Sequence, residues 1–393
     1  MLEIPGRRYR SRNSTSQLLA PPKGGVFNSA PEAYNKKVLT YLLRVNLDIK
    51  EKPIEKALRF KQAVSSIAYF GRRGKVVIIS HRGRPQSRDA SLSLRPYQEL
   101  ISRALKRPVF FFPDFDFGAM AEKIRRGKKG DVFLVENIRF LPGESRNDPG
   151  LAKKLATLGD YYVNDDFATS HRKDASLVAI TKFLPSEAGP LLKEEIKRLS
   201  RAMIKPPKPF ALIIGGVKVV DKVGVIKNLL PETDAVLIGG ASANTFLKLK
   251  GVDLKKSLYE PAMLETARKL LGSEKVFPPL DWCWGNNQIL DIGPKTISLF
   301  KEKIGRSRLV VWNGPMGLFE KKEFSRGSRV LVEAILKGRS EAIIGGGETT
   351  SLFIGRKLPK DGRIFLSAGG GAMLLFLAGQ KLPALEALKK QRR

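Results

Sequence analysis

Short apolar runs alternate with longer amphipathic stretches along almost the whole chain from residue 38 onward. The runs are rich in Val, Ile, Leu and Phe, as strands are when a parallel sheet buries both of their faces. The stretches between them, such as residues 54–70 and 93–105, carry apolar residues at helical spacing. This alternation predicts an α/β protein built on doubly wound parallel sheets.

The predicted strands form two sets, separated by a predicted long connecting helix over residues 191–203. The first set covers residues 38–45, 76–80, 108–112, 132–136 and 161–165. The second set covers residues 210–216, 235–240, 275–279, 309–314, 341–347 and 363–371. Two sets predict two domains, which we place at residues 27–187 and 188–375. We expect residues 376–393 to return to the first domain and residues 1–26 to form a basic, disordered extension.

The two halves carry different residues where their strands end. The first half has arginine and histidine there, within SHRGRP (80–85), ENIRF (136–140) and NDDFATSHR (164–172). The second half has glycines, joined by Asn313 and Glu348. Ligands of open α/β sheets bind beyond the carboxyl ends of the strands, and arginine forks bind phosphate and carboxylate. A basic pocket facing a glycine-lined shelf indicates a kinase with a small anionic substrate.

The stretch from Ile213 to Leu230 shows the phosphate chemistry most directly. A buried strand leads through two glycines into a helix on which Lys218 and Lys222 are four residues apart and share one face. The glycines allow close backbone approach, and a helix N-terminus offers free N–H donors to an anion. The spacing is not that of a Walker A loop. Taken alone, the stretch fits either a phosphate site or an ordinary strand-to-helix corner.

Composition and charge argue against several other classes of protein. One cysteine, Cys283, excludes an internal disulfide and fits a reducing, cytoplasmic location, while two histidines and no Cys/His cluster disfavour a zinc site. No uninterrupted apolar run is long enough to span a membrane. The net charge of +33 splits into +16 over residues 1–190 and +17 over residues 191–393. Such an even spread disfavours a nucleic-acid-binding protein, which we keep as the alternative.

Eight colinear motifs closely resemble the phosphoglycerate kinase family. They are SHRGRP, VENIRF, NDDFATSHRKDAS, IIGGVKVVDK, LDIGPKT, VVWNGPMGLFE, IIGGGETT and SAGGGA. The resemblance covers roughly residues 35 to 387 and implies two Rossmann-like domains that close about a hinge. It also implies a monomeric, Mg²⁺-dependent enzyme of glycolysis. In that family, phosphate moves between ATP and the carboxylate of 3-phosphoglycerate, with 1,3-bisphosphoglycerate and ADP on the other side.

The family's functional residues fall on matching positions of this chain. The resemblance places the triose-phosphate site at Asn46, Asp48, Arg59, His81, Arg84, Arg139 and Arg172. It places the nucleotide site at Gly215, Gly216, Lys222, Gly239, Gly240, Leu290, Asn313, Pro315, Glu320, Gly347, Glu348 and Thr349. The groups around the moving phosphoryl would be Arg59, Lys218, Gly369, Gly370 and Gly371, and the Mg²⁺ ligand would be Glu348.

Several positions depart from the family pattern. Where the family has an aspartate and an asparagine, this chain has Asn46 and Asp48, so the acid and the amide are exchanged. Glu348 replaces the family's metal-binding aspartate and is one methylene longer. Val217 and Val220 are bulkier than the Ala and Ser that are common there. His171 borders the substrate positions, and the sequence leaves open whether it supports the site or is structural.

Overall fold

The structure is a computed structural model that describes residues 38–390. Two six-stranded sheets form its two α/β domains, and every strand pair within them is parallel. Their strand orders are β3-β4-β2-β1-β5-β6 and β14-β13-β12-β7-β8-β9. Doubly wound parallel sheets are therefore confirmed. The predicted extension over residues 1–26 lies outside the described residues.

The first sheet begins the described chain. Its strands are β1 (Thr40–Arg44), β2 (Lys75–Ile79), β3 (Val109–Phe112), β4 (Val132–Val135), β5 (Tyr161–Asn164) and β6 (Ser186–Ala188). Its helices are α2 (Leu58–Gly71), α3 (Arg95–Leu105), α4 (Phe117–Arg126) and α5 (Pro149–Ala156). Separate apolar clusters form on the two faces of the sheet, one under α2 and α3 and the other under α4 and α5. Both faces are covered, which explains why its central strands are apolar throughout.

The second sheet repeats this architecture. Its strands are β7 (Phe210–Ile214), β8 (Ala235–Ile238), β9 (Val276–Phe277), β12 (Leu309–Asn313), β13 (Glu341–Gly345) and β14 (Ile364–Ser367). Its helices are α7 (Val220–Leu229), α8 (Ser242–Leu249), α9 (Leu264–Leu271), α10 (Pro294–Arg306), α11 (Arg326–Lys337), α12 (Gly347–Ser351) and α13 (Gly371–Leu377). A small antiparallel hairpin, β10 (Trp282–Gly285) and β11 (Gln288–Ile292), lies outside both sheets.

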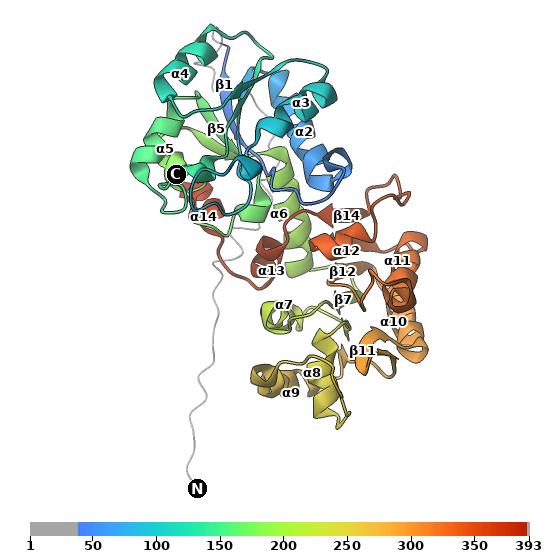
Figure 1. Ribbon diagram of the computed structural model, residues 1–393. Helices are drawn as coiled ribbons and strands as arrows, with labels where there is room; N and C mark the ends of the chain where they lie inside the picture. Colours follow the sequence, from blue (N-terminus) through green and yellow to red (C-terminus); the bar gives the residue numbers. More distant parts are fainter. Residues whose placement is uncertain (1–37, 391–393) are drawn as a thin grey trace.

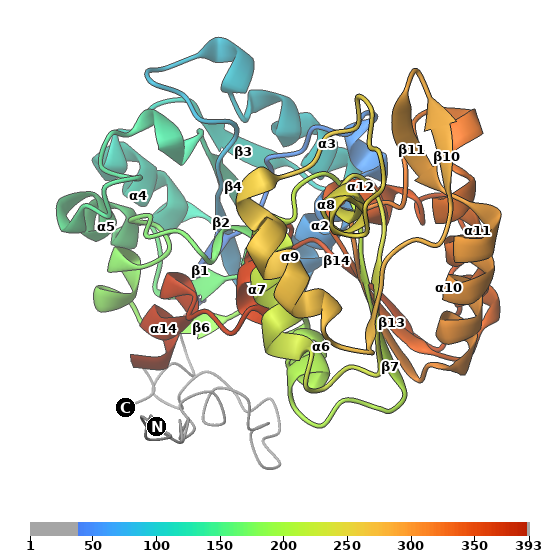
Figure 2. The same ribbon diagram turned by 90° about the horizontal axis from the view of Figure 1, so that it is seen from below.

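One helix, α6 (Pro190–Met203), runs between the two domains (Figure 1). It contacts α2 and, in the second domain, α13, and an apolar cluster passes from one domain into the other along it. Phe167 and Phe376 meet edge to face across this junction, with ring centroids 5.9 Å apart. The last helix, α14 (Pro383–Lys390), packs on β6 of the first domain (Figures 1 and 2). Across residues 38–390, no helix combines the length and apolar character needed to cross a membrane.

Candidate active site

A fully buried arginine, Arg44, organises the carboxyl edge of the first sheet. It ends β1, and its guanidinium donates to Asp166 Oδ2 at 3.0 Å, to Ser176 Oγ at 3.2 Å and to His81 Nδ1 at 2.9 Å. A charge without water must be paired and hydrogen-bonded, and Asp166 supplies the pairing. Arg44, the last residue of β1, therefore holds the buried polar side chains beneath the predicted substrate residues in place.

The contact with Arg44 also fixes the protonation of His81. A guanidinium has no acceptor, so Nδ1 of the imidazole must accept and the ring proton must be on Nε2. Burial lowers the pKa of His81 well below its usual value, and the positive charges of Arg44 and Arg139 lower it further. At neutral pH the His81 ring is therefore uncharged. Its Nε2, which carries the proton, lies 4.0 Å from Asp48 Oδ2.

The exchanged pair of residues, Asn46 and Asp48, has a defined geometry. Asn46 Nδ2 donates to Asp166 Oδ1 at 3.0 Å, and Asn46 Oδ1 accepts from the Asp48 amide, also at 3.0 Å. Asp48 Oδ1 accepts from the Gly83 amide at 3.0 Å. An amide is suited to position 46 because it can donate to the neighbouring carboxylate of Asp166, which an ionised acid cannot do.

Two of the predicted arginines converge on a buried aspartate that the sequence prediction missed. Arg172 Nε donates to Asp174 Oδ2 at 2.8 Å, and Arg139 NH2 lies 3.7 Å from the same oxygen. Burial lowers the pKa of Arg139 to about 10, with a further contribution from the charge of Arg172. Arg139 Nε is buried and has no partner within residues 38–390. One carboxylate for two guanidiniums leaves positive charge that an anion can neutralise.

Two further residues of the predicted substrate region, Arg84 and His171, are both exposed. Arg84 is exposed, and its side chain has no hydrogen bond or ion pair among the described residues. It is free to move to a ligand. His171 is exposed, and burial of part of its ring lowers its pKa. The charge of the neighbouring Arg172 lowers this pKa further, but no side-chain hydrogen bond or ion pair joins His171 to the predicted residues, so its role stays open.

In the second domain, glycines bring three strand ends into backbone contact. Gly215 and Gly216 follow β7, Gly240 follows β8 and Gly314 follows β12. A Cβ on Gly215 would meet Pro315 O at 2.2 Å, and one on Gly240 would meet Gly216 N at 2.5 Å. The amides of Gly215 and Gly216 donate to Asn313 O and Pro315 O. These N–H groups therefore hold the loops together and are not free for a phosphate.

A pocket of about 280 Å³ opens beside this glycine contact. Six of the predicted nucleotide residues line it, namely Gly216, Gly240, Leu290, Pro315, Glu320 and Glu348. Much of the remaining lining is apolar, including Leu247, Trp282 and Met316. An apolar slot with carboxylates at its edge suits a flat base and a sugar hydroxyl.

The expectation that Lys218 and Lys222 share one helix face is wrong, because Lys218 lies before α7 and Lys222 lies in its first turn. Lys218 is exposed and its ammonium has no partner among the described residues, whereas Lys222 is 7% exposed and donates to Lys218 O at 3.2 Å. Burial lowers the pKa of Lys222. Val217 and Val220 are 58% and 54% exposed, so their bulk projects outward from the loop.

The N-terminus of α7 is already occupied by a carboxylate. Glu260, from the segment before α9, accepts from the amides of Val219 at 2.7 Å and Val220 at 3.1 Å. Its own amide donates to Thr245 Oγ1 at 3.1 Å, which ties the segment to α8. The helix end that the sequence indicated as a phosphate site is thus capped from within the protein.

The predicted metal ligand, Glu348, lies in the first turn of α12. Its carboxylate is exposed and makes no hydrogen bond or ion pair within the described residues. Asn313 and Thr349 tie the adjoining loops, since Asn313 Nδ2 donates to Gly345 O at 3.0 Å and Thr349 Oγ1 accepts from Gly314 N at 2.7 Å. Between residues 38 and 390, no group of three or more His, Cys, Asp or Glu side chains is arranged so that it could hold a metal ion. One carboxylate still fits Mg²⁺, which commonly takes its other ligands from phosphates and water.

Arg59 links the first-domain site to the glycine turn of the second domain. Its guanidinium donates to Asp48 O at 3.1 Å and to Ala368 O, directly before the glycine turn, at 3.4 Å. Gly369 packs on Phe167 so closely that a Cβ would lie 2.7 Å from the ring. An arginine of the first domain thus contacts the loop Gly369–Gly371 of the second.

Most of the predicted residues are brought to these two facing edges. Six of the substrate residues form one connected region, namely Asn46, Asp48, Arg59, His81, Arg139 and Arg172. The other six nucleotide residues do not line the pocket, although some contact residues that do, as Gly215 contacts Pro315 and Gly239 contacts Met316; the six are Gly215, Lys222, Gly239, Asn313, Gly347 and Thr349. The sequence analysis assigned no role to Arg44, Asp166, Asp174 or Glu260. Asp166 and Asp174 lie inside a matched motif and Arg44 lies two residues before Asn46, whereas nothing local marks Glu260.

Comparison with known proteins identifies the family. The family model described as phosphoglycerate kinase matches residues 31–380. The phosphoglycerate kinase of Thermosipho africanus is 40% identical over 378 residues, covering 88% of this chain and 94% of that protein. That of Dictyoglomus turgidum is 39% identical over 376 residues, covering 88% and 95%.

Solved structures agree with this assignment. Phosphoglycerate kinase from Pyrococcus horikoshii superimposes with a TM-score of 0.80 at 32% identity, covering 92% of this chain and 98% of that one. The enzyme from Coxiella burnetii gives a TM-score of 0.77 at 31% identity, covering 91% and 97%. None of these matches supports the nucleic-acid-binding alternative. The chain belongs to the phosphoglycerate kinase family.

Proposed function

We propose that this chain is an active phosphoglycerate kinase, which transfers phosphate reversibly between ATP and the carboxylate of 3-phosphoglycerate. The contact of Arg59 with Ala368 O carries the proposal. It brings the basic edge of one domain to the glycine turn of the other, and a donor and an acceptor held on different domains must meet at such a junction.

The reaction needs charge stabilisation more than acid–base catalysis. The accepting carboxylate is ionised at neutral pH, so no general base has to activate it. The transferring phosphoryl group needs in-line positioning and cations around its oxygens. Arg59 and Lys218 are the proposed cations, because one contacts the glycine turn and the other carries an unpaired ammonium.

The first domain would hold the triose phosphate. Arg139 and Arg172 share one carboxylate and so keep positive charge for the substrate phosphate, and Arg84 is free to join them. His81 would donate from Nε2 to a substrate oxygen. Because the ring is neutral, its contribution is directional hydrogen bonding and not charge.

The second domain would hold the nucleotide, with its base in the apolar slot and Glu320 near the sugar. Glu348 would hold Mg²⁺, which supplies charge neutralisation on the nucleotide phosphates. Closing the domains would exclude water that could otherwise hydrolyse ATP. A monomeric state and a cytoplasmic location stay predictions, and light scattering in solution checks the first.

A coupled assay with purified protein tests the proposal. We expect turnover that requires both ATP and 3-phosphoglycerate, and a fall in kcat of at least about a hundredfold in Arg59→Ala. Titrating Mg²⁺ and Mn²⁺ against wild type and Glu348→Asp tests the metal ligand, since a shorter carboxylate should shift the metal concentration at half-maximal rate. No substrate-dependent turnover would reject the activity, and an unchanged Arg59→Ala rate would reject its assigned role.

A further inference from the structure

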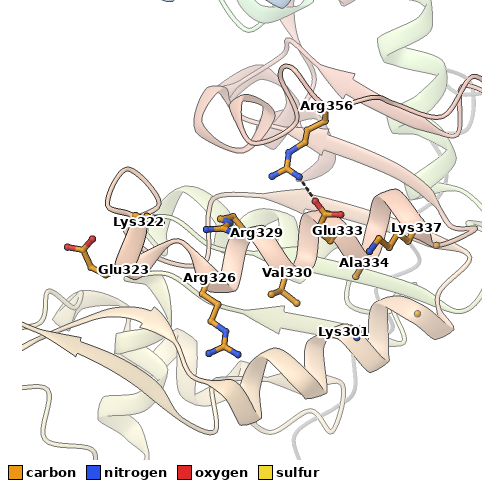
Figure 3. Close-up of a pocket in the computed structure, with 12 residues that line it drawn as sticks. Lys301, Lys322, Glu323, Arg326, Arg329, Val330, Glu333, Ala334, Lys337 and Arg356 are labelled. Carbon is orange, nitrogen blue, oxygen red and sulfur yellow. Dashed lines mark hydrogen bonds and ion pairs between the residues drawn. The ribbon is translucent and has the colours of Figure 1, made fainter.

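A basic groove of about 1030 Å³ lies between α10 and α11, outside the site described above (Figure 3). Six cationic side chains line it, namely Lys301, Lys322, Arg326, Arg329, Lys337 and Arg356. Figures 1 and 2 place α10 and α11 side by side at the edge of the second domain, on the side away from the first domain. The groove shares no lining residue with the nucleotide pocket.

The cations of the groove are poorly neutralised. Only Glu323 and Glu333 are acidic among its lining residues, so six positive and two negative charges leave +4. Glu333 is paired with Arg356 (Figure 3). The other five cations have no carboxylate within 4.0 Å among residues 38–390. Cations gathered in a concave surface raise the local concentration of anions.

The shape of the groove suits an extended ligand. Arg326, Arg329, Glu333 and Lys337 follow one face of α11 at helical spacing, a run of about 16 Å at 1.5 Å per residue. Val330 and Ala334 form an aliphatic floor between them. On the facing helix α10, a Cβ added to Gly305 would meet no atom within 4 Å, so the space above this glycine is open.

We propose that this groove binds a linear chain of phosphate groups without bases, of the kind that inorganic polyphosphate represents. A nucleic acid strand fits less well, because no aromatic side chain lines the groove to stack on a base. An extended acidic peptide would turn only about two or three side chains toward a 16 Å surface. A phosphate chain carries charge along its whole length and can reach all five unpaired cations.

Titration of the full chain with inorganic polyphosphate tests the proposal. We expect saturable binding that weakens when salt is raised from about 50 to 200 mM. The groove variant Lys301→Gln/Arg326→Gln/Arg329→Gln should lose at least about tenfold in affinity. The matched control Arg125→Gln/Arg126→Gln/Lys129→Gln also removes three positive charges, around the end of α4, and its affinity for polyphosphate should fall by less than about twofold.

A second variant tests the groove while every cation stays in place. Ala334→Glu adds a carboxylate to the groove floor at a helical position that accepts glutamate, and it should weaken polyphosphate binding by a similar factor. Equal losses in the groove and control variants would overturn the proposal, since net charge alone would then explain binding. Tighter binding of an oligonucleotide or of poly-glutamate at the same groove residues would also overturn it.

Discussion

At the scale of single residues, the exchange of acid and amide at Asn46 and Asp48 is explained by Asp166. The Asn46 amide donates to Asp166 Oδ1, while the other oxygen of Asp166 accepts from Arg44 and from Thr169 Oγ1. An aspartate at position 46 would bring a half-buried carboxylate to about 3.0 Å from the buried carboxylate of Asp166. This chain instead has its carboxylate two residues later, at Asp48, where it accepts from the Gly83 amide.

We expect Asn46→Asp to lower the free energy of unfolding by about 1–3 kcal/mol and to raise the KM for 3-phosphoglycerate. The double variant Asn46→Asp/Asp166→Asn removes the repulsion between the two carboxylates and should be less destabilised than the sum of the two single variants, although it also neutralises the carboxylate that pairs with Arg44. Urea unfolding and steady-state kinetics of the two single variants and the double variant measure the coupling. Additive effects would show that the Asn46–Asp166 contact does not constrain position 46.

Lys218, before α7, and Lys222, in its first turn, give a second residue-scale prediction. Lys218→Met should leave stability within about 0.5 kcal/mol of wild type, since the side chain is exposed, but should lower kcat strongly. Lys222→Met keeps a stem of similar length in a buried site where burial lowers the lysine pKa. It should keep or raise the thermal midpoint while raising the KM for ATP. A Lys218→Met enzyme with normal kcat would contradict the role assigned to Lys218.

At the scale of an element, Glu260 holds the start of α7 and with it the loop that carries Lys218. Its carboxylate satisfies two amides that would otherwise attract the nucleotide phosphates. In the proposed function the cap would leave the phosphates to Lys218, Lys222 and the glycine turn, and it would restrict the movement of the loop that carries Lys218.

Removing this cap should affect catalysis more than nucleotide binding. Glu260→Ala should lower kcat about tenfold and stability by about 0.5–2 kcal/mol, because two helix-end amides lose their acceptor. Glu260→Gln keeps one acceptor oxygen and should recover part of kcat. Glu265→Ala, on an exposed side chain of α9, is the control. Equal loss of kcat in the Gln and Ala variants would argue against a positioning role.

The elements that the sequence predicted well are those whose burial is uniform. β1, β2, β7 and β12 are buried at every position, and each coincides with a predicted apolar run. The β10–β11 hairpin escaped prediction because most of its positions are half-exposed and it joins neither sheet. A three-residue strand such as β6 is too short to leave a pattern of its own.

The residues of the site also divide into those that the sequence predicted and those that it did not. Motif residues such as His81 and Arg172 were predictable because they stand directly after strands, where parallel sheets gather their ligands. The residues that hold them in place were not predictable, because those contacts join positions that are far apart in the sequence. Glu260 reaches amides about 40 residues away, and the protonation of His81 depends on a buried arginine 37 positions earlier. Neither contact has a signature in local sequence.

At the scale of the whole molecule, two buried carboxylates connect the domains to α6. Asp165 Oδ1 accepts from Leu192 N at 2.9 Å, which fixes the first turn of α6 to the first domain. One turn later Glu195 accepts from Ser367 Oγ and Ala368 N, both at 2.8 Å, at the start of the glycine turn. Burial raises the pKa of Asp165 to about 6 and that of Glu195 to about 7.

The sign of the pH effect follows from these shifts. Glu195 binds its proton more tightly when folded than when unfolded, where its pKa is 4.5. Its contribution to stability is therefore complete below about pH 4.5 and is lost as pH rises through about 7. Glu195→Gln carries no titrating group, so its stability relative to wild type should rise between pH 5 and pH 8, by up to about 3 kcal/mol. Urea unfolding at both pH values measures this difference.

Glu194→Gln, on the same turn of α6 but half-exposed, is the matched control; because the charge of Glu194 contributes to the raised pKa of Glu195, this variant should shift the pH profile slightly to lower pH but keep it. A Glu195→Gln profile that parallels wild type would contradict the assignment. Because Glu195 accepts from the residues that lead into Gly369–Gly371, its ionisation should also alter domain closure. We therefore expect kcat of the wild type to change between pH 6 and pH 8 in a way that Glu195→Gln removes, with the KM for ATP unaffected.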